Sequence, residues 1–448
     1  MRQKHPLNIK MPETTEDSVL IDKKLAKKMR INICKEVPNE VLSSILMHMG
    51  FTQIKKMLLV SKEYLNKIRN CYFLWKNKCE PYGLPFLRSN TEFLSIIRKN
   101  KYLKQSWKKG TDERRCCVVT NQTDITQMVS TDKYVISSSD DQTIKIFSYN
   151  GIYIRTLIGH LGGVWCFCSD GKYLISGSTD KSIRIWDIST GWTIKVLTGH
   201  RSTVRCLKIY EKLIISGSRD SDIRVWNYEG DCLHILSGHS ASVRCMDIND
   251  KFLLSGSYDG DVILWDYKNG KTIKKMARHS NRVYSVVLGK NYIASGSQDA
   301  TINLSKIDGV LIAVLRSHRL VVAWLFLVYG IKEELKYEKY IITSGADGLV
   351  CKWDIMTGNL IYKISENEQI TSMFVICDLL IVSTVYNVKM YDLKSGKFIR
   401  FLKKNVSGVY KVIGNDRNII IGFSEDVTPN IEIISNIVHL NKKIKLTL

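Results

Sequence analysis

The chain has 448 residues, of which 44% are hydrophobic, and its formal net charge is +23. This length and apolar content allow a large core and more than one domain. The longest apolar run, Leu320 to Ile331, is shorter than the roughly 18 residues that a membrane span needs, so we expect no membrane segment. The first residues contain no apolar run of the secretory type, and the 12 cysteines show no metal-ligand spacing. We therefore expect reduced thiols, a nuclear or cytoplasmic location, and neither metal nor other cofactor.

Residues 1–33 are predicted to form a basic, flexible arm. Within this region, residues 14–35 suggest a helix only weakly, and the segment KKLAKKMR fits either a nuclear-import signal or a solvated basic helix.

Residues 34–83 have the pattern of a small helical domain. Leu42, Ile45, Leu46 and Met49 recur at helical spacing, and Pro38 stands where a helix can begin. Residues 84–115, which include SWKKG, resemble a helical linker to the domain that follows. From the pattern alone, the alternative for the helices of residues 34–83 is a small helical cap on the domain that follows.

The remaining residues, 116–448, repeat with a period of about 40 residues. Each regular unit has a histidine after a turn and an aromatic or aliphatic residue that closes a strand. The histidines are His160, His200, His239, His279 and His318. The closing residues are Phe147, Trp186, Trp226, Trp265, Leu304, Trp353, Tyr391 and Ile434. Such a repeat predicts a mainly β fold, a WD-repeat β-propeller, with eight blades as our prediction and seven as the alternative.

Segments such as SIRIWD and DIRVWN alternate apolar and polar residues, as strands do. An aspartate follows most of the histidines by 20 residues, whereas Asp347 follows His318 by 29 because of an insertion centred on IKEELKYEKY. In WD-repeat proteins such a His and Asp hydrogen-bond through the unit to a Trp and a Ser. We therefore expect the repeating histidines to be structural and not catalytic.

Two aligned series of residues differ from unit to unit and mark the candidate binding site. The residues five positions after each histidine are Trp165, Arg205, Arg244, Tyr284 and Ala323, and those before each turn aspartate are Thr179, Arg219, Tyr258, Gln298 and Ala346. Both series lie near one rim of the central channel in a propeller. An arginine among apolar neighbours needs a counter-charge from the protein or from a ligand. Three arginines with aromatic walls suit a phosphate, unless they pair with local carboxylates or are ordinary surface charges.

The segments GHRSTVRCLKIYEKLIISGSRDSDIRVW and GHSASVRCMDINDKFLLSGSYDGDVILW closely resemble the phosphodegron-reading propeller of the cell-division-control F-box/WD-repeat receptors. The resemblance runs from about residue 36 to the C-terminus. It implies that Arg205, Arg219 and Arg244 hold the phosphate of a phosphothreonine that is followed by proline. The other residues that it places around the peptide are Tyr284, Trp165, Ser202, Thr203, Thr179 and Tyr258. Where the family has Trp-Arg, this chain has Tyr410-Lys411, so Lys411 keeps the charge without the forked donors.

The segment from Val37 to Leu46, followed by Val60-Ser61 and by Leu74-Trp75 with Cys79, resembles an F-box. This resemblance implies a contact with a Skp-type adaptor by packing helices into a groove. The candidate contact residues are Pro38, Leu42, Ile45, Leu46, Leu58 and Val60. Some relatives dimerise through a segment before the F-box, so a homodimer stays open.

Together these resemblances imply the substrate-recognition subunit of an SCF-type ubiquitin ligase, which links phosphorylated proteins to the cullin and RING partners and catalyses nothing itself. The alternative is a basic WD-repeat scaffold of RNA or ribosome-assembly complexes. We expect no nucleic-acid binding, because the aromatic residues lie on the rim and do not interleave with a basic groove. An enzyme has no support in the sequence, which contains no Gly-rich phosphate loop and no nucleophile motif.

Overall fold

The computed structural model describes residues 104–436 except 112, 121, 122, 333, 334, 377, 416 and 427. The predicted arm at 1–33, the predicted F-box at 34–83 with its adaptor-binding candidates, and residues 84–103 of the predicted linker lie outside the described residues. In the described part, no helix is long and apolar enough to cross a membrane.

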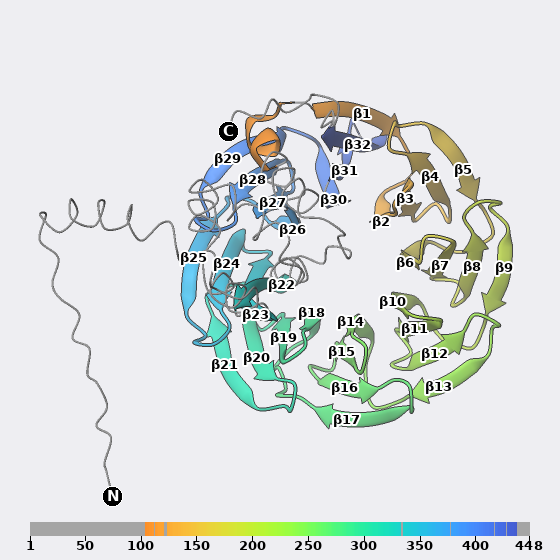
Figure 1. Cartoon of the computed structure of the whole chain (residues 1–448). Coiled ribbons are helices and arrows are strands. Elements are labelled where there is room, and N and C mark those ends of the chain that lie inside the picture. Colours follow the sequence, from red (N-terminus) through yellow and green to blue (C-terminus); the bar gives the residue numbers. More distant parts are fainter. Residues whose placement is uncertain are drawn as a thin grey trace, which may run out of the picture. The chain divides into compact units, whose positions relative to one another are not determined.

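Eight antiparallel sheets of four strands each surround a central channel, which confirms the prediction of eight blades over seven (Figure 1). Blades 1 to 3 contain β2 (Ile125–Ser130), β3 (Tyr134–Ser139), β4 (Ile144–Ser148), β5 (Tyr153–Leu157); β6 (Val164–Ser169), β7 (Tyr173–Ser178), β8 (Ile183–Asp187), β9 (Thr193–Leu197); and β10 (Val204–Tyr210), β11 (Leu213–Ser218), β12 (Ile223–Asn227), β13 (Cys232–Leu236).

The strands of blades 1 to 7 run from the channel outward in chain order. Blades 4 to 6 contain β14 (Val243–Ile248), β15 (Leu253–Ser257), β16 (Val262–Asp266), β17 (Lys271–Lys275); β18 (Val283–Leu288), β19 (Tyr292–Ser297), β20 (Thr301–Lys306), β21 (Leu311–Arg316); and β22 (Val322–Lys332), β23 (Leu335–Gly345), β24 (Leu349–Asp354), β25 (Leu360–Ser365). The insertion predicted in the sixth unit thus lengthens the two inner strands of blade 6, β22 and β23.

The last two blades have lost most of the repeat signature and still form complete sheets. Blades 7 and 8 contain β26 (Ile370–Ile376), β27 (Leu379–Thr384), β28 (Val388–Asp392), β29 (Phe398–Lys403); and β30 (Gly408–Asn415), β31 (Asn418–Glu425), β32 (Thr428–Asn436), β1 (Glu113–Val119). The outer strand of blade 8, β1, pairs with β32 in antiparallel register from Glu113–Asn436 to Val119–Asn430. Both ends of the described chain therefore close the ring, and β1 begins three residues inside the segment that the sequence assigned to the linker.

The hydrophobic core lies between neighbouring blades, because each sheet is apolar on both faces. Ile136 and Ile146 of blade 1, for example, form one buried cluster with Phe167 and Trp186 of blade 2. The middle strands are almost entirely buried, which explains why their sequences are continuous apolar runs that end in small residues.

Residues 104–109 form a short helix that packs against blades 7 and 8. Its Trp107 is 0% exposed and belongs to the core cluster of blades 7 and 8. Arg400 donates from Nε to the backbone oxygen of Trp107 at 2.9 Å, and Lys108 pairs with Asp392 at 2.8 Å. Lys104, on the other side of Trp107, pairs with Asp378 at 3.0 Å, so the segment that enters the propeller is held by one buried side chain and by an ion pair on each side of it.

A buried hydrogen-bond network in blade 3 confirms the structural role predicted for the histidines. His200 bonds to Asp220 through Nδ1 at 2.9 Å and to Ser216 through Nε2 at 2.8 Å, and Trp226 donates to the same Ser216 at 2.9 Å. Equivalent networks are present in blades 2, 4 and 6, with Thr343 in place of the serine in blade 6. Blade 5 keeps the His279 bonds to Asp299 and Ser295 but has Leu304 in place of Trp.

Candidate binding site at the channel mouth

A β-bulge at the same place on the inner strands presents one residue per blade to the channel. In seven blades the pairing of the inner strand with its neighbour skips one residue near the strand start. The skipped residues are Thr126, Trp165, Arg205, Arg244, Tyr284, Thr371 and Tyr410. Because a bulged residue leaves the ladder and its side chain is re-aimed, a charged residue is tolerated here between apolar neighbours.

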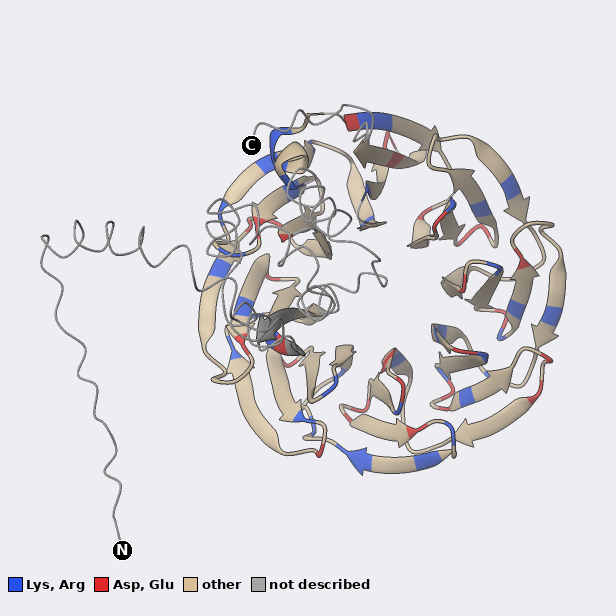
Figure 2. Ribbon diagram, viewed as in Figure 1, with Lys and Arg blue, Asp and Glu red and all other residues tan. Residues whose placement is uncertain are grey.

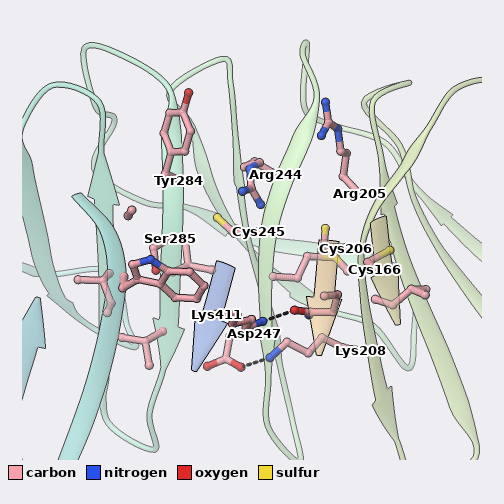
Figure 3. Close-up of a pocket in the computed structure, with 18 of the residues that line it drawn as sticks. Cys166, Arg205, Cys206, Lys208, Arg244, Cys245, Asp247, Tyr284, Ser285 and Lys411 are labelled. Carbon is pink, nitrogen blue, oxygen red and sulfur yellow. Dashed lines mark hydrogen bonds and ion pairs between the residues drawn. The ribbon is translucent and has the colours of Figure 1, made fainter. Parts of the chain in front are cut away.

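Four consecutive blades place two arginines between two aromatic residues. The Arg205 guanidinium lies 4.5 Å from the Trp165 ring centroid, and the Arg244 guanidinium lies 5.9 Å from the Tyr284 ring centroid. Trp165 is 41% exposed, so one of these aromatic faces is open to a ligand. Figure 3 shows Arg205, Arg244 and Tyr284 at one level of the channel wall. Each pair can hold an arginine in place without neutralising it.

The turn residues of the second series lie beside the starts of the inner strands because backbone hydrogen bonds join the two. The N–H of Arg219 donates to the Thr203 oxygen at 2.9 Å, and the N–H of Tyr258 donates to the Ser242 oxygen at 3.0 Å. The Thr179 N–H makes the equivalent bond to Gly163 at 3.0 Å. These bonds place the turn series at the rim of the same mouth, above the bulge series.

The three arginines lack a carboxylate partner among the described residues. The ion pairs of the described part include none for Arg205, Arg219 or Arg244, so the alternative that they pair with local carboxylates does not hold there. Arg219 is exposed, whereas Arg205 and Arg244 are half-buried. Half-buried guanidinium groups without a counter-charge favour an anionic ligand over an incidental surface charge.

Tyr258 joins the rim to the bulge series. Its ring centroid lies 5.5 Å from that of Tyr284. Burial raises the pKa of Tyr258, against the opposing effect of the Arg244 and Arg205 charges. The hydroxyl therefore stays protonated at neutral pH and can donate a hydrogen bond to an acceptor such as a phosphate oxygen.

Arg282 is a further cation of the rim that the sequence analysis missed. Its guanidinium lies 5.0 Å from the Tyr258 ring centroid, and its backbone oxygen accepts the N–H of Gln298 at 2.9 Å. It occupies the third position after the histidine, where other units have Gly163, Thr203 and Ser242. The backbone oxygen at this position accepts the N–H of the turn residue in each unit, so the position belongs to the rim. A comparison of the units at this position would therefore have identified Arg282.

The predicted site residues fall into three groups. Trp165, Arg205, Arg244 and Tyr284 line the mouth of a cavity of about 890 Å³, and the surrounding rim holds Ser202, Thr203, Thr179, Arg219 and Tyr258. Lys411 lines the same cavity but lies at another level, with Lys208 and Asp247 (Figure 3). The bulged residue of blade 8 is its neighbour Tyr410, whose hydroxyl donates to Asp124 at 2.8 Å. The structure thus brings the three arginines and their aromatic neighbours together and separates Lys411 from them.

Other polar groups of the channel wall have structural roles. Cys166, Cys206 and Cys245 follow the bulges, and burial raises the pKa of Cys206 to about 12, so this group stays a thiol. The described residues hold no cluster of three His, Cys, Asp or Glu side chains that could bind a metal. Lys and Arg residues of the described part are spread around the ring, on outer strands such as β1 and β17 (Figure 2).

Comparison with known proteins supports the WD40 assignment. The family described as "WD domain, G-beta repeat" matches residues 151–187, 191–227 and 230–266. Each match joins the outer strand of one blade to the first three strands of the next blade, so a sequence repeat and a blade are offset by one strand. Among solved structures, the computationally designed Ika8 protein is 24% identical, with a TM-score of 0.63, over 69% of this chain and 96% of its own.

A second solved structure, the WD40 β-propeller domain of Doa1, is 21% identical, with a TM-score of 0.50, over 72% of this chain and 97% of its own. At these identities the likeness concerns the fold alone. The chain therefore contains WD40 repeats arranged as a WD40 propeller.

Proposed function

On the basis of this WD40 propeller, an architecture that serves as a protein-interaction scaffold, we propose that the chain is the substrate receptor of an SCF-type ubiquitin ligase. In this proposal the channel mouth binds a phosphothreonine-proline segment of a target protein, and residues 34–83 dock on a Skp-type adaptor. The receptor brings the target to the cullin and RING partners and performs no chemistry itself.

The observation that carries this proposal is the pair of half-buried arginines, Arg205 and Arg244, that lack a carboxylate in the described part. Guanidinium groups bind phosphate through forked, charge-assisted hydrogen bonds, each of which contributes about 1.5–3 kcal/mol. Both groups lie against aromatic rings that restrict their side chains before a ligand arrives, so less entropy is lost on binding. Arg219 and the Tyr258 hydroxyl at the rim can supply further donors to the same phosphate.

The adaptor half of the proposal rests on the resemblance of residues 34–83 to an F-box, which lies outside the described residues. The buried Trp107 adds support, because it attaches the end of the predicted linker firmly to blades 7 and 8. A receptor needs such a connection if captured substrate is to stay at a defined distance from the catalytic partners.

The proposal is tested by fluorescence anisotropy of a Leu-Leu-phosphoThr-Pro peptide and its unphosphorylated twin with the full chain. We expect binding only of the phosphorylated peptide, and a loss of about 10- to 100-fold in Arg205→Ala, as for one charge-assisted bond. Arg114→Ala is the matched control, because Arg114 lies on the outer strand β1, where it bonds to Asn150. Equal binding of both peptides, or equal effects of the two substitutions, would contradict the proposal.

A further inference from the structure

The cavity below the mouth contains a lysine whose charge nothing in the described part balances. Lys411 lies on β30, the inner strand of blade 8, one residue after the bulge. Its amine donates to Gln127 Oε1 of β2 and lies 5.6 Å from the Trp324 ring centroid of β22. Neither neighbour carries a charge, and the described residues provide no ion pair for Lys411. A half-buried ammonium without a counter-ion is costly, so its presence in a cavity favours an anionic ligand.

The other charged groups around this cavity make the region cationic. The cavity is lined by Arg205, Lys208, Arg244 and Lys411, and by Asp247 as the single carboxylate among its lining residues. Asp247 is already satisfied, because it pairs with Lys208 at 2.9 Å and accepts the backbone N–H of Leu288 at 2.9 Å. The attraction of Asp247 for Lys208 leaves the charge of Lys411 available to a ligand.

We propose that the channel below the mouth is a second anion-binding site, built around Lys411, that takes a phosphate or carboxylate group. Donors for such a group are the Lys411 ammonium and the amide nitrogen of Gln127, with the hydroxyl of Ser285 on the same cavity wall. The cavity of about 890 Å³ has ample room for a phosphate and its water. The anion can come from a second modified or acidic residue of the peptide at the mouth, or from a free phosphate compound. The first source rests on the proposed function, whereas the second is independent of it.

Protonation of Lys411 makes anion binding at this site dependent on pH. Burial, together with the positive charges of Arg244 and Lys208, lowers the pKa of Lys411 to about 8. An anion beside the amine favours the charged form, so binding should take up protons and should weaken as the pH rises above 8. The charged groups that line the cavity together with Lys411 are Arg205 and Lys208 of β10 and Arg244 and Asp247 of β14.

The test is isothermal titration calorimetry of inorganic pyrophosphate with the full chain. We expect binding to weaken about 10- to 100-fold in Lys411→Met, as for one charge-assisted hydrogen bond, and the loss at high pH to be smaller in Lys411→Arg, which stays charged. Lys352→Met is the matched control: Lys352 is a buried lysine of blade 6 whose amine donates to the Leu393 oxygen at 3.0 Å, outside the cavity. The proposal would be overturned if pyrophosphate did not bind, or if it bound the unmodified chain and the Lys411→Met variant with equal affinity.

A second arm distinguishes the two sources of the anion. Phosphothreonine peptides carrying a second phosphate on each neighbouring residue in turn are compared with the singly phosphorylated peptide. If the peptide supplies the anion, one of them gains at least tenfold in affinity, and this gain disappears in Lys411→Met. If no peptide gains while pyrophosphate still depends on Lys411, the site takes a free phosphate compound. A failure of the singly phosphorylated peptide to bind contradicts only the proposed function, because the pyrophosphate arm does not involve the peptide.

Discussion

Replacing Lys411 by methionine should stabilise the protein, although the lysine makes a hydrogen bond. Lowering its pKa from the ordinary 10.5 to about 8 corresponds to about 3 kcal/mol against folding, at about 1.4 kcal/mol for each pKa unit. Methionine has a similar length and leaves the Gln127 oxygen in reach of the Met128 N–H at 3.3 Å. Lys411→Met should therefore be more stable by up to about 3 kcal/mol at pH 7.

The sign of this effect predicts how it changes with pH. Between pH 8 and 10.5 the unfolded chain binds a proton at this position that the folded protein has released, so the stability of the unmodified protein rises with pH in that window. The advantage of Lys411→Met should shrink across it. The assay is urea unfolding of both proteins at pH 7 and at pH 10, and the difference between them removes the titration of all other groups. A variant that is less stable at pH 7, or a difference that does not change with pH, would refute the reasoning.

Three further outcomes follow from the structure. Asp220→Ala should destabilise the protein by about 2–4 kcal/mol in urea unfolding, because it leaves His200 and the Arg201 N–H without their acceptor. Burial would raise the pKa of Asp220, but hydrogen bonds from His200 and Arg201 outweigh it and lower the pKa. The stabilisation by Asp220 is thus complete above the unfolded pKa of about 4 and should decrease as the pH falls below it. An equal difference in unfolding free energy between the unmodified protein and Asp220→Ala at pH 7 and at pH 2 would contradict this assignment. Trp107→Ala should cost about 3–5 kcal/mol and expose residues 104–111 to limited proteolysis, and an unchanged digestion pattern would argue against the anchor. Raising salt from about 50 to 200 mM should weaken phosphopeptide binding only modestly, whereas a loss of about 10³-fold or more would indicate a nucleic-acid ligand held by many phosphates.

The repeating part of the fold was predictable because each blade satisfies the same local requirements. The His, Asp, Ser and Trp of a unit are fixed in spacing by one buried network, so the spacing alone identifies the blade. In blades 7 and 8 this network is lost, and other contacts take its place: Tyr391, for instance, donates to the buried Glu366. The closing of blade 8 by β1 was not predicted, since the pairing of residues 113–119 with 430–436 joins segments that share no repeat signature.

The position of the candidate binding site was predictable in part for the same reason. Arg205 and Arg244 occupy aligned positions in neighbouring units, and the alignment of the repeats was enough to bring them together. The prediction grouped Lys411 with them by resemblance, but a residue that directly follows a bulge points along the channel at another level. The bulge is a departure from regular strand pairing that the alternation of apolar residues does not show. The absence of carboxylates beside the arginines, in the described part, also depends on tertiary packing and could not be derived from spacing.

The most direct test of the proposed function joins its two halves in one measurement. An immobilised phosphothreonine-proline peptide is incubated with a purified Skp-type adaptor, with and without the full chain, and the retained adaptor is quantified. The prediction is that the adaptor is retained only when the full chain and the phosphate are both present, and that Arg205→Ala and a Leu42→Ala, Ile45→Ala double variant each abolish retention. Retention of the chain without the adaptor, or of both on the unphosphorylated peptide, would contradict a phosphate-reading receptor that links its target to a ligase.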